Sequence, residues 1–345
     1  VNEYLDLLEK NADFLQTVQN GLQPSFGEDE NKDEKKNEII KIQLLKKIQQ
    51  NSDKIIFSEL LIWFFVQEKK FDGAFLHAKA LDKRMNEEGE RIMLLGQLCA
   101  SDEVYETAVK CFRYVIEKGK ESYYYMGARM ELLSVMYKKV TTKFDYTQDD
   151  LIELEKNYIT TLDELGKNVS TVSLIKNFAH LQAFYLNKTD EAIALLQETI
   201  KIQNINEKIQ AECKLELGDI FLITEQIWDA SLLYSQVAFD FKHEPLGEEA
   251  KFRNAKLSYY NNEFLWTQAQ LDVLKAATQK LIANDAMELS LLISDNLSQN
   301  PDSFSLCLFA HADLLMFRNR DDKAMAVLDS ITKKFPGNSL ADRSE

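Results

Sequence analysis

The stretch KLELGDIFLITEQIWDASLLYSQV, from Lys214 to Val237, decides the fold of this chain. Its apolar residues recur every three or four positions on both sides of a short break, which is the pattern of two amphipathic helices. Gly218 and Ala230 place one small residue in each half, where a larger side chain would force two packed helices apart. The stretch therefore predicts a helical hairpin.

Composition extends this prediction to the whole chain. The 345 residues include only 11 Gly and 4 Pro, so turn formers are scarce and helix formers are abundant. Hydrophobic residues make up 45% of the chain, enough for a continuous core, and the formal net charge is -15. A strongly acidic surface disfavours phosphate backbones and anionic membranes as partners. The composition favours an all-α protein that binds neither nucleic acid nor membrane.

Hairpins similar to the first recur along the sequence. In each, a small residue on the second helix marks the contact with the first helix, and we refer to it as the anchor residue. Ala74 and Ala108 are 34 residues apart, and Gly96 repeats the position of Gly218. The predicted anchors are Ala74, Ala108, Ala192, Ala230, Ala269 and Ala324.

This order of small and large apolar positions, with a 34-residue step, resembles the tetratricopeptide repeat (TPR) family, of the type seen in bacterial multi-repeat scaffolds. The resemblance covers most of residues 53–336, although Ser58 and Ile92 replace the opening aromatic of the family and His180 stands where the template has Gly218. It implies a right-handed superhelical solenoid of antiparallel helix pairs. Such a solenoid has a concave groove, lined mainly by first helices, that binds peptide segments or partner helices.

The repeat pattern also divides the chain. Residues 1–52 are predicted to form N-terminal helices, one at Val1–Asn20 and one at Glu38–Gln50, with a charged, solvated linker at 21–37. Residues 53–337 are predicted to form the repeat array, and residues 338–345 the start of a further repeat. Two segments depart from the repeat inside the array. Ser122–Val140 and Thr147–Leu165 are expected to form a longer pair, and Asn284–Leu297 an extra helix without a mate.

The register of the family predicts which side chains face the groove. Lys251 and Asn254 alone resemble the Lys/Asn clamp that some members use for a partner's terminal carboxylate, and adjacent repeats lack matching residues. Acidic and apolar groups dominate the groove, which favours a basic or amphipathic partner segment, unless the aromatic members are core residues only. The predicted groove residues are Trp63, Glu90, Met93, Leu181, Phe184, Glu212, Leu215, Asp219, Lys251, Asn254, Ser258, Phe309, Asp313 and Met316.

Motifs for chemistry are missing from the sequence. No phosphate-loop, dinucleotide, serine-hydrolase or zinc-protease pattern occurs, the four His are scattered, and the four Cys sit inside apolar helical patterns. Tyr123 to Tyr125 could stack a nucleic-acid base, but no cations surround them. We therefore predict no enzyme activity, no cofactor and no metal site.

Two readings of function follow. The leading hypothesis is a non-enzymatic scaffold that mediates protein–protein interaction through its concave groove. The alternative is a structural or regulatory segment of a larger protein, such as an envelope-associated assembly factor, with any catalytic domain outside this chain. Unpaired cysteines suit the cytoplasm without excluding a bacterial periplasm, so the sequence leaves the compartment open.

Overall fold

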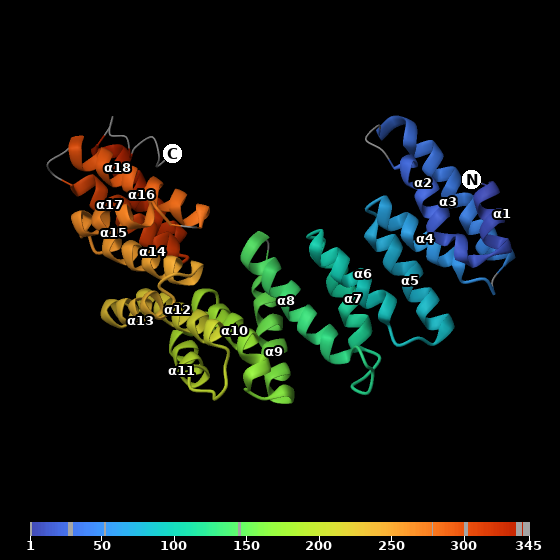
Figure 1. Cartoon of the computed structure of the whole chain (residues 1–345), viewed down its shortest axis with the longest axis horizontal. Coiled ribbons are helices and arrows are strands. Elements are labelled where there is room, and N and C mark those ends of the chain that lie inside the picture. The colour runs from blue at the N-terminus through green and yellow to red at the C-terminus, as the bar shows by residue number, and fades with distance from the viewer. Residues whose placement is uncertain are drawn as a thin grey trace. The chain divides into compact units, whose positions relative to one another are not determined.

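The computed structural model describes residues 2–26, 30–51, 53–143, 146–277, 279–299, 303–335 and 340, and the regular structure in these ranges is entirely helical. The chain divides into two compact units, residues 1–150 and 151–345 (Figure 1). Each unit is built largely from successive helix pairs. The all-α repeat fold predicted from the sequence is confirmed, and no described helix is both long and apolar enough to cross a membrane.

In the first unit, α4 pairs with α5, α6 pairs with α7, and α8 packs against α7. The three N-terminal helices pack beside α4, where Leu5, Val18 and Leu44 are buried. The helices are α1 (Asn2–Lys10), α2 (Leu15–Leu22), α3 (Glu30–Gln50), α4 (Ile56–Gln67), α5 (Phe71–Met85), α6 (Glu90–Ser101), α7 (Tyr105–Ile116) and α8 (Tyr125–Lys143).

The N-terminal region differs from the sequence prediction in two places. The single helix expected before Asn20 is interrupted at Asn11, whose side chain accepts a hydrogen bond from the Asp13 N–H at 2.9 Å and starts a short 3₁₀ turn. The second helix begins at Glu30 rather than Glu38, inside the predicted linker. The charged block is rich in Glu and Lys, which are good helix formers and need no apolar neighbours to continue a helix.

In the second unit, α10 pairs with α11, α12 with α13, α14 with α15, and α17 with α18. Helix α16 packs against both α15 and α17, so the prediction that it lacks a mate is wrong. The helices are α9 (Gln148–Leu165), α10 (Val172–Phe184), α11 (Thr189–Thr199), α12 (Glu207–Ile223), α13 (Ile227–Asp240), α14 (Pro245–Tyr260), α15 (Phe264–Leu274), α16 (Lys280–Gln299), α17 (Phe304–Phe317) and α18 (Asp321–Lys334).

Small residues sit at the helix contacts as predicted. A Cβ atom on Gly218 would lie 2.5 Å from the Tyr234 ring, and one on Gly96 would lie 2.7 Å from the Phe112 ring. The anchor alanines are buried, with one exception. Ala269 is exposed on α15, where Thr267 takes the anchor position two residues earlier and is fully buried.

Thr267 fits this position because its hydroxyl donates to the Glu263 carbonyl oxygen at 3.0 Å, which satisfies the polar group within its own helix.

All six hairpins share one turn. In each hairpin, the second helix begins two residues after a residue with positive φ. In five of the six, the residue that follows the positive-φ residue donates its backbone N–H to the carbonyl oxygen five positions earlier in the chain, as Gln226 does to Phe221 at 2.8 Å. The repeat is therefore present in the backbone even where the turn sequences differ. The positive-φ residues of these turns are Lys69, Glu103, Asn187, Glu225, Asn262 and Asn319.

Glycine at such a turn should stabilise the fold. Lys69 is exposed and has φ 56°, a conformation that costs a residue with a Cβ about 1 kcal/mol and costs glycine nothing. We expect Lys69→Gly to raise the free energy of unfolding by about 0.5 kcal/mol, after the larger chain entropy of glycine is subtracted. Urea titration measures this, with Lys70→Gly, at φ -89°, as the control that should lower stability. Equal effects of the two substitutions would argue against strain at the turn.

Candidate functional site

A cavity of about 400 Å³ lies in the second unit, where helices of three hairpins meet. Its walls come from α12, α13, α14, α16 and α17, so residues far apart in the sequence converge there. Helix α16, which lies outside the predicted repeat pattern, contributes residues of its first two turns. The lining residues are Asp219, Leu222, Tyr234, Glu249, Phe252, Arg253, Lys256, Tyr260, Gln279, Leu281, Ile282, Asp285 and Phe317.

An ion-pair network forms one wall of this cavity. The Arg253 guanidinium donates to Asp219 at 2.6 Å and to Glu249 at 2.5 Å, and the Tyr234 hydroxyl donates to Asp219 at 2.7 Å. Burial raises the pKa of Asp219 to about 6 despite the attraction of Arg253. Both oxygens of the Asp219 carboxylate are therefore occupied, and the network ties α12, α13 and α14 together.

Lys256 lies next to this network without an ion pair among the described residues. Its ammonium is 5.8 Å from the centroid of the Tyr260 ring, a cation–π contact. Burial lowers the pKa of Lys256, and the nearby carboxylates of Asp313, Asp219 and Asp285 oppose that shift. Lys256 thus acts as the counter-charge to several acids at once.

The remaining walls are largely apolar. Leu222 and Ile282 are buried, Phe252 is half-buried, and Leu281 is exposed at the start of α16. Phe317 lies 6.3 Å from Tyr260, measured between ring centroids. The cavity therefore combines apolar walls with a few charged groups, which is the usual character of a binding site.

Some predicted groove residues meet at or beside this cavity. Asp219 lines it, and Asp313 accepts a hydrogen bond from the Tyr259 hydroxyl at 3.1 Å. Phe184 packs edge to face against Phe317 at 5.7 Å between centroids.

Lys251 and Asn254 do not point toward a shared ligand. The Lys251 ammonium donates to the Lys242 carbonyl oxygen at 3.3 Å, and Asn254 bonds to the Ser231 and Ser235 hydroxyls on α13. The resemblance to a carboxylate clamp is therefore not supported by this geometry.

The other predicted groove residues of the second unit lie elsewhere. Leu181 and Leu215 are buried in the core, and Ser258 is also buried. Glu212 forms an ion pair with Lys176. Phe309 is half-buried against a core cluster, and Met316 is exposed.

In the first unit, the predicted groove residues do not converge. Trp63 packs edge to face against Phe26 at 5.5 Å between ring centroids, and Met93 is buried. Glu90 is exposed and lines a separate hollow.

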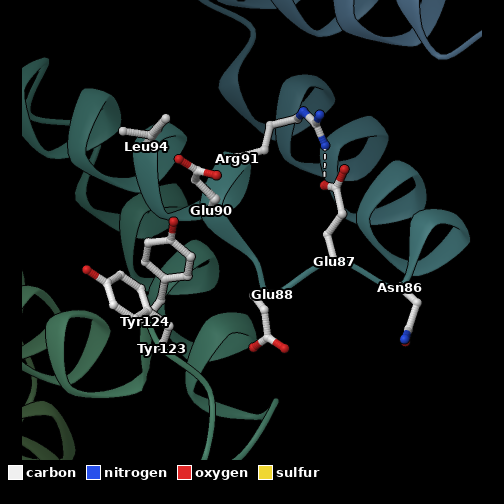
Figure 2. Close-up of a pocket in the computed structure, with 8 residues that line it drawn as sticks. All are labelled: Asn86, Glu87, Glu88, Glu90, Arg91, Leu94, Tyr123 and Tyr124. Atoms are coloured by element: carbon white, nitrogen blue, oxygen red, sulfur yellow. Dashed lines mark hydrogen bonds and ion pairs between the residues drawn. The ribbon is translucent and has the colours of Figure 1, made fainter.

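That hollow has a volume of about 600 Å³ and lies between the α5–α6 connection and the start of α8. Figure 2 shows Arg91 turned toward Glu87 and the Tyr124 hydroxyl pointing toward the Glu90 carboxylate. Burial and the charge of Glu90 raise the pKa of Tyr124. Its lining residues are Asn86, Glu87, Glu88, Glu90, Arg91, Leu94, Tyr123 and Tyr124.

Tyr123 to Tyr125 do not form the stacking platform considered for a nucleic-acid base. Tyr123 is 85% exposed, whereas Tyr125 is buried, and the Tyr123 and Tyr124 rings meet edge to face at 5.0 Å between centroids. Arg91 is held by Glu87 and Glu59, the latter at 2.9 Å. The hollow is therefore acidic and aromatic, which suits a cation better than a phosphate.

Sequence reasoning missed the residues that shape the cavity. Arg253 and Lys256 lie three residues apart on α14, a spacing that places them on the same side of the helix, next to the predicted Asp219. That spacing is the sequence signal that could have identified Arg253 and Lys256. No such signal marks Asp285 and Leu281, because they lie on the helix that departs from the repeat.

The hairpins identify the type of fold. They share one turn geometry and carry small residues at the predicted contacts. The chain is an all-α repeat protein built from helical hairpins. Within the described part of the chain, no group of three His, Cys, Asp or Glu side chains could hold a metal ion.

No protein-family model and no curated protein matches the chain. The solved structures that are similar to this chain include the following three. One, titled as a functional characterisation of pilF from Pseudomonas aeruginosa, is 15% identical, with 75% of this chain and 96% of that chain covered and a TM-score of 0.43. A tetratricopeptide repeat protein from Parabacteroides merdae is 10% identical, with 74% and 97% covered and a TM-score of 0.46. The TPR domain of P58(IPK) is 11% identical, with 99% and 95% covered and a TM-score of 0.24.

Identities and scores this low assign neither a partner nor an activity to the chain.

Proposed function

We propose that this chain is a non-enzymatic interaction scaffold that holds a basic, amphipathic segment of a protein partner at the cavity of its second unit. The cavity itself carries the proposal, because apolar walls and charged groups meet there in one space of about 400 Å³. That volume accommodates one or two large side chains of a bound segment.

The charges of the cavity favour a cation on that segment. Arg253 is occupied by Asp219 and Glu249, and Lys256 is balanced by the acids around it. Asp285 has no ion-pair partner among the described residues and lies at the wall formed by α16. An apolar side chain against Phe252 and Phe317, with a Lys or Arg reaching Asp285, would satisfy both parts of the site.

The hollow of the first unit has the same preference. Glu88 and Glu90 are exposed there beside Tyr123, whose ring face can hold a cation. Considered separately, each unit thus offers a place for a basic side chain, in keeping with the net charge of -15.

The geometry gives little support to catalysis. A general acid or base must reach a substrate proton, but both oxygens of the Asp219 carboxylate are bonded to neighbouring side chains. Raised and lowered pKa values in this cluster arise from burial within a network that joins helices, which is a structural role.

A capture experiment with matched variants tests the proposal. Leu281→Lys places a positive charge in the cavity wall beside Asp285, and Leu291→Lys makes the same change at an exposed position of α16 outside it. We expect proteins captured from a native extract by the wild type to be lost with Leu281→Lys, which repels a basic segment, and retained with Leu291→Lys, as measured by quantitative mass spectrometry. Equal capture by the two variants would rule out the cavity as the binding site.

A further inference from the structure

The outer sides of α13 and α15 expose large apolar side chains. Trp228 is 86% exposed, Phe239 82% and Leu265 81%, and Leu232, Trp266 and Val273 are also exposed. On α13, spacings of four and seven residues place Trp228, Leu232 and Phe239 on one side of the helix. We name these six residues the outer face.

The other hairpins of the chain show that helix packing does not require large apolar side chains at these outward-facing positions. The positions two before and two after the anchor residue point outward. On α13 they are Trp228 and Leu232, around Ala230, and on α15 they are Leu265 and Ala269, around Thr267. The equivalent positions on the other second helices are Asp72 and Leu76, Glu106 and Lys110, Asp190 and Ala194, and Asp322 and Ala326.

Each of those four pairs contains a charged residue, and Leu76 is their one large apolar member. The apolar outer positions of α13 and α15 are therefore specific to these two consecutive hairpins. An exposed group of large apolar side chains usually marks an interaction surface.

The charge on the same helices indicates the kind of partner. Asp229, Asp240 and Asp272 are the charged residues of α13 and α15, and neither helix contains Lys or Arg. The Lys214 ammonium lies 3.8 Å from Asp240 and the Lys275 ammonium 2.8 Å from Asp272, whereas Asp229 has no ion pair among the described residues. A second copy of the chain would bring together two molecules of net charge -15, which disfavours self-association. A partner with basic residues beside its apolar side chains would pair with Asp229.

We propose that the outer face docks an amphipathic, basic helix of a partner protein. Apolar side chains of that helix cover Trp228, Leu232 and Phe239, and a flanking Lys or Arg residue lies near Asp229. This surface is distinct from the cavity, because Tyr234, the cavity residue of α13, is buried between the helices. The proposals for the two sites can therefore be tested independently.

A synthetic helix of alternating Leu and Lys blocks, about 18 residues long, is a suitable probe for the full chain. Its binding is measured by fluorescence anisotropy of the labelled peptide and by the emission of the chain's tryptophans. We expect the double variant Trp228→Ser, Phe239→Ser to weaken binding at least about tenfold, and a Leu/Glu peptide to bind the wild type at least about tenfold more weakly.

The matched control is Leu76→Ser with Met325→Ser, which removes side chains of 65% and 64% exposure from other second helices and should leave binding unchanged. All the substituted side chains are exposed, so thermal unfolding should be the same for each variant. Unchanged binding by the Trp228 and Phe239 variant, equal binding of the Leu/Glu peptide, or absence of saturable binding would overturn the proposal. So would a wild-type dimer that the double variant turns into a monomer, because it would assign the face to a second copy.

Discussion

Replacing Arg253 by alanine is expected to lower the free energy of unfolding by about 3 kcal/mol at neutral pH. The substitution leaves the largely buried Asp219 carboxylate with Tyr234 as its hydrogen-bond donor and without its ion pair. It also removes the ion pair of Glu249, but this side chain is more exposed than Asp219, so the loss of its partner costs less stability. Urea-induced unfolding followed by circular dichroism measures the loss. Arg84→Ala, at an exposed residue of α5 that forms no ion pair with the described residues, should change stability by less than about 0.5 kcal/mol.

The effect of Arg253→Ala should depend on pH. Burial raises the pKa of Asp219 to about 6, above its ordinary value of 3.8, so the folded state binds this proton more tightly than the unfolded state. The group therefore adds stability as the pH falls from about 7 toward 4. Without Arg253 the pKa of Asp219 rises further, and the gain is larger. We expect the stability difference between wild type and variant to shrink between about pH 8 and pH 5, and a constant difference would contradict this explanation.

Replacing Gly218 by valine is expected to lower the free energy of unfolding by about 1–3 kcal/mol through overpacking. The added Cβ would lie 2.5 Å from the Tyr234 ring, which cannot swing away easily because its hydroxyl is bonded to Asp219. Gly127→Val is the matched control, since the nearest atom to its Cβ is the flexible end of Met93 at 3.4 Å. We expect that control to be close to neutral, as measured by thermal and urea unfolding.

A double-mutant cycle separates crowding from other causes. In a Tyr234→Ala background the ring that Gly218→Val would strike is gone, so the cost of valine should fall markedly. An equal cost in both backgrounds would mean that Gly218 is required for another reason.

The hairpins and their contacts could be predicted from the sequence because they depend on local information. The apolar spacing gives the helices, and side-chain size at Gly96, Gly218 and Ala230 gives the point where two helices approach. The anchor residue of α15 was predicted wrongly, because the prediction used only spacing and side-chain size. Ala269 is small and well spaced, while Thr267 fills the anchor position only because its hydroxyl bonds to its own helix.

The cavity could not be predicted in the same way. Its residues come from five helices, and α16 contributes Leu281 and Asp285 from outside the repeat pattern. Asp219 alone was named from the sequence among the residues that line it. The register of the repeat also placed Leu181 and Leu215 in the groove, whereas both are buried, because a period identifies a face of a helix but not what packs on it.

The binding role of the cavity is tested most directly by the affinity of a captured partner segment for matched charge-reversal variants. Asp285→Lys reverses a charge in the cavity wall, and Glu288→Lys reverses an exposed charge of α16 outside it. Calorimetric titration should show a dissociation constant at least about tenfold larger for Asp285→Lys and close to wild type for Glu288→Lys. Equal dissociation constants for the wild type and both variants would contradict a binding role for the cavity.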